Sequence, residues 1–543
     1  MKKTITAILL MASAAAGYAQ TAYDALTFSA NNYEGTARTV AMGNAFTALG
    51  GDLGSITINP AGSAVAGYTQ VSITPALTFS TNYAKGVSPF DDGSLPYFDR
   101  EMKSSISKFN IPNLGMTYNW DTGRKSGLKS LTFGFIVNKS ASYDQDIFVS
   151  GRNSTTSFMA QMAAEATEMG YTGTDLGAND AYDLMPWKMV AGYQSGMIST
   201  FNYDDLFVGA SEVIMYNEDT GEDEIFLGGP LDQTYGRSVS GGKYDYVINI
   251  GANISDFLYL GANLGISSLD YNYNEYFKEV AVDPTDFEII LDDRPMYFEQ
   301  MKYDYSYRAT GSGFYGKIGF ILTPVAGLRI GGAIQTPTIT TIDEEWRISA
   351  STKFSDNSAS GSSASPYGEF RYNLRSPMIA NFGAAYTLGS LGLISADYEV
   401  CNYSGMKFGG SAYDRETFEE VNADIRERFG KAHTFRVGLE VKPVTSLALR
   451  AGYNITGSAE KIDAWGEPVK ATYTKNLSFG LGYSSKGSFF ADMAARLTTL
   501  PDEYFMPYGD YMYDTDGYIL DPAPEILNRQ SLWKVFLTIG WRF

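Results

Sequence analysis

The chain has 543 residues, a formal net charge of −20 at pH 7 and a sequence pI near 4.6. This acidity argues against nucleic acid as a partner, because nucleic-acid-binding surfaces carry clustered Lys and Arg. A single cysteine excludes an intramolecular disulfide framework, and 39 Tyr, 32 Phe and 56 Gly favour an antiparallel β protein.

The first residues have the pattern of a secretory signal peptide. A basic start at Lys2 and Lys3 precedes the apolar residues 5–16, and small residues precede the cleavage point expected after Ala19. The apolar run is too short for a stable membrane span, and no run of 18 apolar residues follows it. We predict a cleaved signal peptide over residues 1–19 and an exported mature protein.

A glycine-rich segment follows the leader. Its central stretch, "GNAFTALGGDLGSITINPAG" (43–62), has one acid, no base and no sustained helix or strand period. Such a segment is too apolar for a solvated linker, and residues 20–67 are too few for a separate domain.

The rest of the chain alternates between apolar and polar residues with the period of a β-strand. Fourteen candidate strands follow one another, an even number that suits closure of a bacterial barrel. They lie near 69–80, 105–120, 129–140, 242–254, 257–273, 301–323, 328–345, 368–388, 391–407, 432–443, 446–458, 470–484, 488–500 and 530–543.

The connections between these strands alternate between short and long. Short turns such as 323–327 and 442–446 belong on the periplasmic side of a barrel, and long loops belong outside the cell. The longest loop, residues 141–241, is a large extracellular insertion. Both termini then lie on the periplasmic side.

The C-terminal "SLWKVFLTIGWRF" (531–543) supports a membrane barrel. Every second residue from Trp533 to Phe543 is apolar, as in a lipid-facing strand of transmembrane length. The terminal Phe543 resembles the signal that barrel-assembly machinery reads. We therefore predict an all-β fold, a transmembrane antiparallel β-barrel of about 14 strands over residues 68–543. We expect a monomer in the outer membrane of a Gram-negative bacterium, surrounded by lipopolysaccharide and outer-membrane lipids.

In such a barrel, residues 20–67 form an N-terminal hatch that plugs the lumen, because fourteen strands enclose a space that must be filled or left as a channel. Buried loop backbone needs hydrogen-bond partners. The polar lumen-facing residues Asn249, Asn253 and Asn263 are the partners we expect.

The segment "GTARTVAMGNAFTALGGDLGSITINPAG" (35–62) resembles the hatch of the long-chain fatty acid transporter family (FadL type), which includes toluene-uptake relatives. Weaker similarity extends over 313–338, 391–405 and 449–454, whereas the insertion at 141–241 departs from the family. The hatch and gating residues that the resemblance and its turn point to are Arg38, Gly43, Ala45, Asn59, Pro60, Ala61 and Gly62.

The resemblance implies a plugged barrel that passes hydrophobic molecules without an energy source. Substrate would be captured between outer loops, sit near the hatch N-terminus, and leave sideways at an inward kink in the third strand. In this chain that strand is 128–144, and Gly134 lies in its middle on the lumen side. We predict broken strand pairing within a few residues of Gly134, because a missing side chain permits a bend.

The long insertion holds a stripe of methionine and aromatic residues at helical spacing. One interpretation is a small satellite core, and the other is a capture groove, because methionine-rich surfaces adapt to varied apolar ligands. The candidate capture residues are Phe158, Met159, Met162, Met169, Leu184, Met185, Trp187 and Met189.

No constellation for catalysis or metal binding appears in the sequence. "GSGFYG" (311–316) satisfies G-x-G-x-x-G, but no helix follows, so dinucleotide binding is not expected. His433 and Cys401 have no partner pattern and are expected to be structural. The acidic stretches 217–224 and 514–517 are expected to be solvated loops. We predict no enzyme, no cofactor and no metal site.

Three functions remain open. Passive uptake of hydrophobic small molecules or lipids, such as long-chain fatty acids, is favoured by the hatch and the even strand count. A general hydrophilic porin would instead have an open lumen. A surface adhesin or receptor would use the loop 141–241 and would tolerate changes in the hatch.

Overall fold

The computed structural model describes residues 21–88, 97–217, 221–291, 294–357, 359–410, 415–463, 466–513 and 519–543. The predicted signal peptide and the acidic stretch at 514–517 lie outside these residues, as does part of 217–224. Within the described ranges, no helix is long and apolar enough to cross a membrane.

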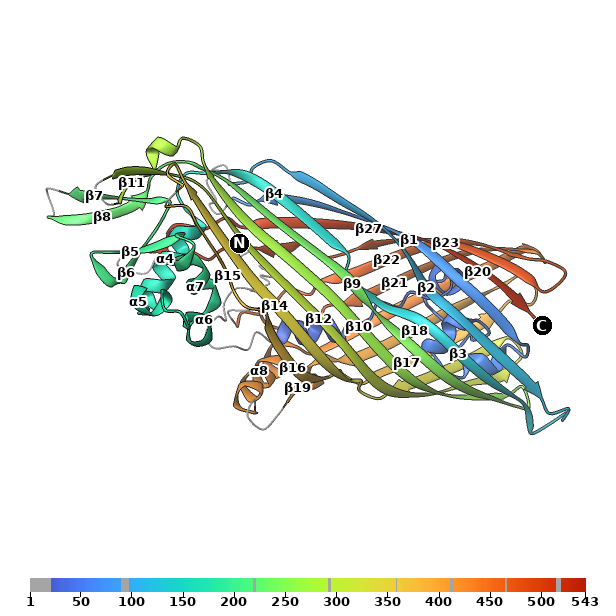
Figure 1. The fold of residues 1–543 in the computed structure, drawn as a ribbon. Helices are drawn as coiled ribbons and strands as arrows, with labels where there is room; N and C mark the ends of the chain where they lie inside the picture. Colours follow the sequence, from blue (N-terminus) through green and yellow to red (C-terminus); the bar gives the residue numbers. More distant parts are fainter. Residues whose placement is uncertain are drawn as a thin grey trace.

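Fourteen antiparallel strands close into a barrel, which confirms the predicted fold (Figure 1). The ring closes where the first strand, β1, pairs with the last, β27. Two of the fourteen strands are each interrupted once, so that β13 continues into β14 and β16 into β17. The barrel strands are β1 (Gln70–Gly86), β2 (Met102–Asp121), β3 (Leu128–Ser142), β9 (Leu231–Ile254), β10 (Leu258–Ala281), β12 (Arg294–Val325), β13 (Leu328–Gln335) with β14 (Ile339–Phe354), β16 (Gly368–Arg375) with β17 (Ile379–Thr387), β18 (Gly392–Asn402), β20 (Lys431–Val444), β21 (Leu447–Gly457), β22 (Tyr473–Ser484), β23 (Phe489–Thr499) and β27 (Ile526–Arg542).

The barrel wall is apolar outside and polar inside, the reverse of a water-soluble domain. On β20, Phe435 is 55% exposed, whereas Arg436 and Glu440 are buried. Large apolar side chains are exposed on strands all around the ring, and these form the apolar belt. Such a belt on a closed barrel is the surface of an outer-membrane protein. Members of the belt include Leu77, Phe79, Phe109, Met116, Phe133, Phe135, Ile248, Leu264, Phe314, Ile318, Phe382, Leu439, Phe479, Trp533 and Leu537.

Four neighbouring strands, β9, β10, β12 and β14, extend farther toward the extracellular side than the strands on the opposite side of the barrel (Figure 1). Their ends carry a lobe built from the long insertion, which we call the extracellular lobe. It consists of β4 (Gln145–Asn153), α4 (Phe158–Glu168), α5 (Gly173–Leu176), α6 (Ala181–Leu184), α7 (Trp187–Gln194), β5 (Ile198–Phe201), β6 (Tyr203–Gly209), β7 (Glu212–Asn217) and β8 (Glu222–Leu227).

The remaining elements are short, apart from one helix that lies beside the barrel mouth. This helix is α8 (Arg415–Arg428), and its Phe418 and Ile425 are buried. The short elements are β11 (Glu288–Leu291), β15 (Gly361–Ala364), β19 (Lys407–Gly409), β24 (Glu503–Phe505), β25 (Met512–Tyr513), β26 (Ile519–Asp521) and 3-10 turns at Pro284–Asp286 and Tyr403–Gly405.

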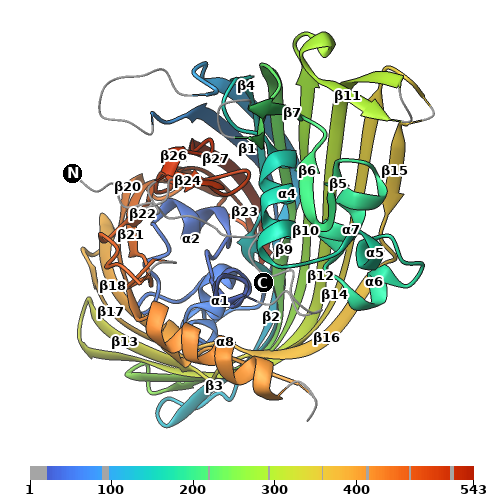
Figure 2. The same ribbon diagram turned by 90° about the vertical axis from the view of Figure 1, so that its left-hand side faces the viewer.

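The hatch lies inside the ring of strands (Figure 2). It begins with α1 (Ala22–Ser29), whose N-terminus is held by a capping box between Thr21 and Asp24. Three short helical turns follow: α2 (Ala37–Ala41), a 3-10 turn (Leu53–Thr57) and α3 (Gly62–Val65). Most hatch residues after α1 are buried, so the segment fills the lumen below the extracellular lobe.

The ring closes through β1 and β27, and each barrel strand pairs with both of its neighbours over at least part of its length, so we expect the barrel to fold without the hatch. Deleting residues 24–64 should therefore leave a folded, heat-modifiable barrel with raised conductance for small ions, measured in planar bilayers. Unchanged conductance would show that the hatch does not close the lumen.

Candidate functional site: the hatch and a break in the barrel wall

Buried charges fix the hatch to the barrel wall. Arg38 on α2 pairs with Glu440 of β20 at 3.0 Å, and Arg450 of β21 pairs with the same carboxylate at 2.6 Å. Arg450 also binds Asp492 of β23 at 2.5 Å. A buried charge is costly unless it is paired, so the two arginines and two carboxylates compensate one another. Arg38 therefore joins the hatch to three wall strands.

The predicted hatch glycine Gly43 lies where the hatch backbone touches the wall. Its φ is +63°, and a Cβ there would lie 2.9 Å from the backbone nitrogen of Tyr453. Both facts exclude a side chain. Ala45, two residues later, is fully buried. Gly62 begins α3, and a Cβ there would lie 2.7 Å from Ser55 Oγ, so this glycine permits a close contact rather than a left-handed bend.

The Asn59 side chain bonds both the hatch and the barrel wall. The Asn59 amide donates to the carbonyls of Thr47 (2.6 Å) and Phe320 (3.0 Å), and its Oδ1 accepts from the N–H of Ala61 (3.1 Å). The side chain thus spans the hatch and β12.

Two of the three predicted wall asparagines bond the hatch. Asn249 donates to the carbonyl of Pro60 at 3.1 Å, and Asn263 donates to that of Ile56 at 2.8 Å. Asn253 instead bonds Asp256 within its own turn.

The predicted break at Gly134 is wrong. The β2–β3 ladder runs without interruption from Asp121–Ser130 to Asn113–Asn138, and β9 pairs β3 on the other side. Gly134 has an ordinary partner on each strand, so its missing side chain does not bend the wall. The ladder stops only after Asn138.

Beyond Asn138 the wall does break. In the part of the chain that the structure describes, no strand pairs with β2 from Met102 to Pro112 on the side away from β1. Pro75 lies at a register shift of β1, and Pro112 lies on β2 beside the end of the β2–β3 ladder. Neither Pro75 nor Pro112 can donate a ladder hydrogen bond, because proline has no backbone N–H. We call the gap between residues 110–112 and 139–142 the wall break.

The hatch bonds the strand edge that the wall break leaves open. Asn32 N–H donates to the carbonyl of Ser140 (2.7 Å), and Glu34 N–H donates to that of Lys139 (2.9 Å). The Glu34 carboxylate forms a buried ion pair with Lys534 of β27. Ser140 lies at a bulge of β3 and is fully buried. The hatch therefore supplies the donors that β2 does not.

The wall break opens at the level of the apolar belt. Phe109 and Ile111, on β2 beside it, are 66% and 41% exposed. Farther out, side chains of β2 bond the chain that follows β3: Lys108 pairs with Asp144 at 2.8 Å, and Ser104 bonds the carbonyl of Asp146 on β4. The break is thus short, and hatch backbone lies behind it.

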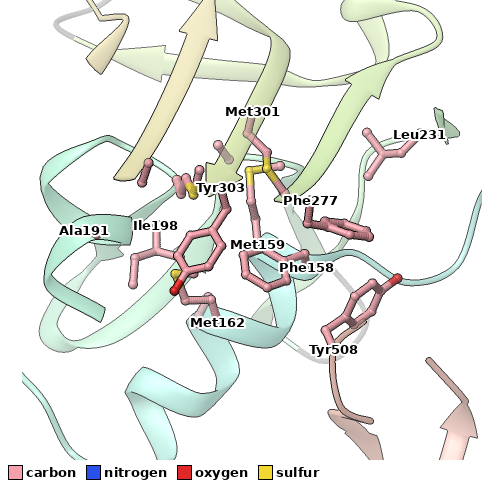
Figure 3. Packing of buried hydrophobic residues seen from close by; sticks show 14 of the residues in the cluster. Phe158, Met159, Met162, Ala191, Ile198, Leu231, Phe277, Met301, Tyr303 and Tyr508 are labelled. Atoms are coloured by element: carbon pink, nitrogen blue, oxygen red, sulfur yellow. The ribbon is translucent and has the colours of Figure 1, made fainter. Parts of the chain in front are cut away.

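The capture candidates divide into two groups. Four of them are at most 1% exposed and belong to the core of the extracellular lobe: Phe158, Met159, Met162 and Met189. The prediction that these four line a capture groove is wrong; Figure 3 shows Phe158, Met159 and Met162 within the packed core. They are covered because α4 packs against β10 and β12; the Phe158 ring lies 5.2 Å from that of Tyr303.

The other four capture candidates reach the surface. Met169 and Leu184 are 61% and 72% exposed, whereas Met185 and Trp187 are half-buried. Trp187 packs 5.8 Å from the ring of Trp346 on β14. A capture role for these four stays a prediction.

The residues expected to be structural have local partners. His433 Nδ1 lies 2.6 Å from the Tyr398 hydroxyl on the neighbouring strand, and Cys401 is buried. The glycines of 311–316 lie within β12. The described residues contain no group of three or more side chains able to hold a metal ion.

Several site residues were missed from the sequence. Glu34, Lys139 and Lys534 meet at the wall break, yet they are far apart in the chain. The only signal was Lys534 on the inward face of the last strand, where a buried cation requires a nearby carboxylate.

No protein-family model and no curated protein matches the chain. Among solved structures, a Pseudomonas aeruginosa FadL homologue matches with a TM-score of 0.50 and 10% identity, over 94% of this chain and 98% of that one. The fold is of the FadL type.

Two further matches have TM-scores below that value. The Ralstonia pickettii toluene transporter TbuX gives 0.44 at 13% identity, covering 94% of this chain and 98% of that chain. The Pseudomonas putida toluene transporter TodX gives 0.45 at 12% identity, covering 95% and 99%.

Replacing Asn59 with Ala should loosen the hatch of this FadL-type barrel. The change removes the side-chain donor to the carbonyls of Thr47 and Phe320 and the acceptor of the Ala61 N–H, at a cost of about 1–3 kcal/mol. We expect faster hydrogen exchange across residues 45–66 and an intact barrel. Asn253→Ala, which removes bonds only within a turn, is the matched control. Equal exchange in the two variants would contradict the assigned role.

The folded extracellular lobe should become less stable as the pH rises. Burial raises the pKa of Glu212 from 4.5 to about 7, although its carboxylate accepts a 2.6 Å bond from the Gly209 N–H. The folded lobe therefore holds a proton that the unfolded lobe releases. This stabilisation is complete below pH 4.5 and is lost as the pH passes about 7.

Protease resistance of the lobe should therefore fall between about pH 5 and about pH 8. Glu212→Gln should flatten that dependence, because glutamine carries no ionisable proton. An equally steep profile in this variant would exclude Glu212 as the cause.

Proposed function

We propose that the protein passes hydrophobic small molecules through the outer membrane without an energy source, and that they leave sideways at the wall break. The observation that carries this proposal is the hatch backbone bonded to the open edge of β3 at the level of the apolar belt. At this point two backbone hydrogen bonds hold the hatch to β3, and the Glu34–Lys534 pair and a 3.2 Å bond from Arg496 to the Tyr33 carbonyl hold it to β27 and β23. A small hatch movement would therefore open the lumen to lipid.

The lumen above the hatch suits apolar molecules. A cluster of buried apolar and aromatic residues joins α1, α8 and the inner faces of β10, β12, β14 and β16. Phe28 of α1 belongs to it, with its ring 5.4 Å from that of Tyr271. A molecule that enters from the extracellular side would meet these rings before it reaches the hatch residues that follow α1. Members of the cluster are Ala22, Phe28, Leu269, Ile342, Tyr372, Leu374, Phe408, Phe418, Ile425 and Phe429.

The sideways exit favours passage into lipid over a hydrophilic pore. A porin needs a continuous water-filled lumen, whereas this lumen contains the buried hatch and its ion pairs. A molecule released at the wall break instead meets Phe109 and Ile111, which face the hydrocarbon. The function so proposed is passage, with no chemical change of the substrate.

Locking the hatch to β3 should stop uptake. In a Cys401→Ser background, Asn32→Cys with Ser140→Cys places two thiols on neighbouring backbones, since Asn32 N–H bonds the Ser140 carbonyl. Oxidation should abolish uptake of a hydrophobic fluorescent probe, and reductant should restore it, because the crosslink holds the exit closed.

The matched control crosslinks Thr434→Cys with Thr456→Cys. These residues are paired across β20 and β21, away from the wall break, and their hydroxyls lie 3.0 Å apart. Oxidation of this pair should leave uptake unchanged. Full uptake by the oxidised protein that carries Asn32→Cys and Ser140→Cys would overturn the sideways exit.

A further inference from the structure

A small cavity lies between the end of α1 and the barrel wall. It borders β9, β10, β13, β14 and β16, and its volume is about 20 Å³. A water-sized group needs roughly 10–15 Å³, so the cavity receives one small group and not an alkyl chain. Its lining residues include Phe28, Ser29, Lys243, Asp245, Leu269, Gln335, Ile342 and Leu374.

Two buried polar side chains line this cavity. Ser29 is 5% exposed, and its hydroxyl is buried with no hydrogen-bond partner within the described part of the chain. Gln335 is 4% exposed and also lines the cavity. Buried polar groups are nearly always hydrogen-bonded. The unpartnered hydroxyl of Ser29 therefore marks the place of a small group that can donate or accept a hydrogen bond.

The ammonium group of Lys243, which lines the cavity, already donates hydrogen bonds to the hatch backbone. Lys243 Nζ donates to the carbonyls of Phe28 (3.1 Å) and Ala30 (2.9 Å) at the end of α1. Asp245, on the same face of β9, lines the same cavity and balances the lysine charge. A ligand carboxylate would add a second negative charge beside Asp245, with few lysine protons left to bind it.

The approach to the cavity is acidic as well. Glu344 lies two residues beyond Ile342 on the inner face of β14 and accepts hydrogen bonds from the hydroxyls of Tyr307 and Tyr372, both at 2.5 Å. Asp24 lies one helical turn before Phe28, on the same side of α1. An anionic head would thus pass two carboxylates, whereas an uncharged chain would follow the apolar side chains of Phe28 and Ile342.

We propose that this cavity binds the uncharged, hydrogen-bonding head of a hydrophobic substrate, a hydroxyl or a primary amide, and excludes a carboxylate. The proposal rests on the proposed function and defines its substrate class. Ser29 and Gln335 bond the head, and the tail enters toward the lumen once the buried side chains of Phe28, Leu269 and Ile342 move apart to admit it.

Binding to the purified full chain in amphipol tests this assignment. Radiolabelled 1-dodecanol is displaced by unlabelled 1-dodecanol, dodecane or dodecanoate at about pH 8, where the carboxylate is ionised. We expect dodecanol to compete about tenfold better than dodecanoate. The carboxylate is repelled by Asp245, Glu344 and Asp24, whereas the alcohol carries no charge for them to repel. Dodecanoate that competes as well as dodecanol would overturn the proposal.

Variants of the cavity separate the head group from the chain. Ser29→Ala and Gln335→Leu should each weaken dodecanol binding several-fold and leave dodecane binding unchanged, since only the alcohol uses their polar atoms. Asp245→Asn should improve competition by dodecanoate, because it leaves the Lys243 charge unbalanced. Heat-modifiability on gels checks that each variant is folded.

The results distinguish this proposal from the proposed function. If dodecane and dodecanol bind equally and neither Ser29→Ala nor Gln335→Leu has an effect, the cavity holds water only. That result would contradict the head-group site but not the passage of apolar molecules. Absence of binding by all three compounds would overturn both.

Discussion

The structure depends on one constraint: no backbone N–H or C=O can be left unpaired where hydrocarbon surrounds the chain. Closure of β1 on β27 satisfies it around most of the ring. At the wall break β2 leaves β3, and donors from the hatch at Asn32 and Glu34 take its place. The hatch is thus part of the wall there. Any movement that opens the exit must expose carbonyl groups of β3, which water or substrate would then contact.

The cost of placing a charged side chain in hydrocarbon explains why the polar core of this protein lies within the barrel. Strand residues that face lipid are apolar, so charges can only point inward, where each needs a partner in a confined space. Arg38 with Glu440, and Glu34 with Lys534, join the hatch to strands more than four hundred residues later in the chain. Long-range ion pairs of this kind order a glycine-rich segment that has little secondary structure of its own.

Local periodicity was sufficient to predict fourteen strands, because a barrel strand repeats every two residues regardless of its neighbours. It did not predict how far β9, β10 and β12 extend beyond the expected bounds. The wall break could not be located in this way. It lies beside Pro75 and Pro112 of adjacent strands, whose proximity the sequence does not reveal, whereas Gly134, the more obvious irregularity, is paired on both sides. Burial of Met159 and Met162 likewise depends on the distant strands against which α4 packs, which no helical stripe reveals.

The unequal strand lengths give the molecule a tall side and a low side. With 32 residues, β12 is about 100 Å long and, at a typical tilt, rises roughly 80 Å, whereas β21 and β23 have only 11 residues each. The rim is therefore cut obliquely. A molecule that approaches the mouth along the cell surface therefore meets a high wall in one sector and a low rim in the opposite one.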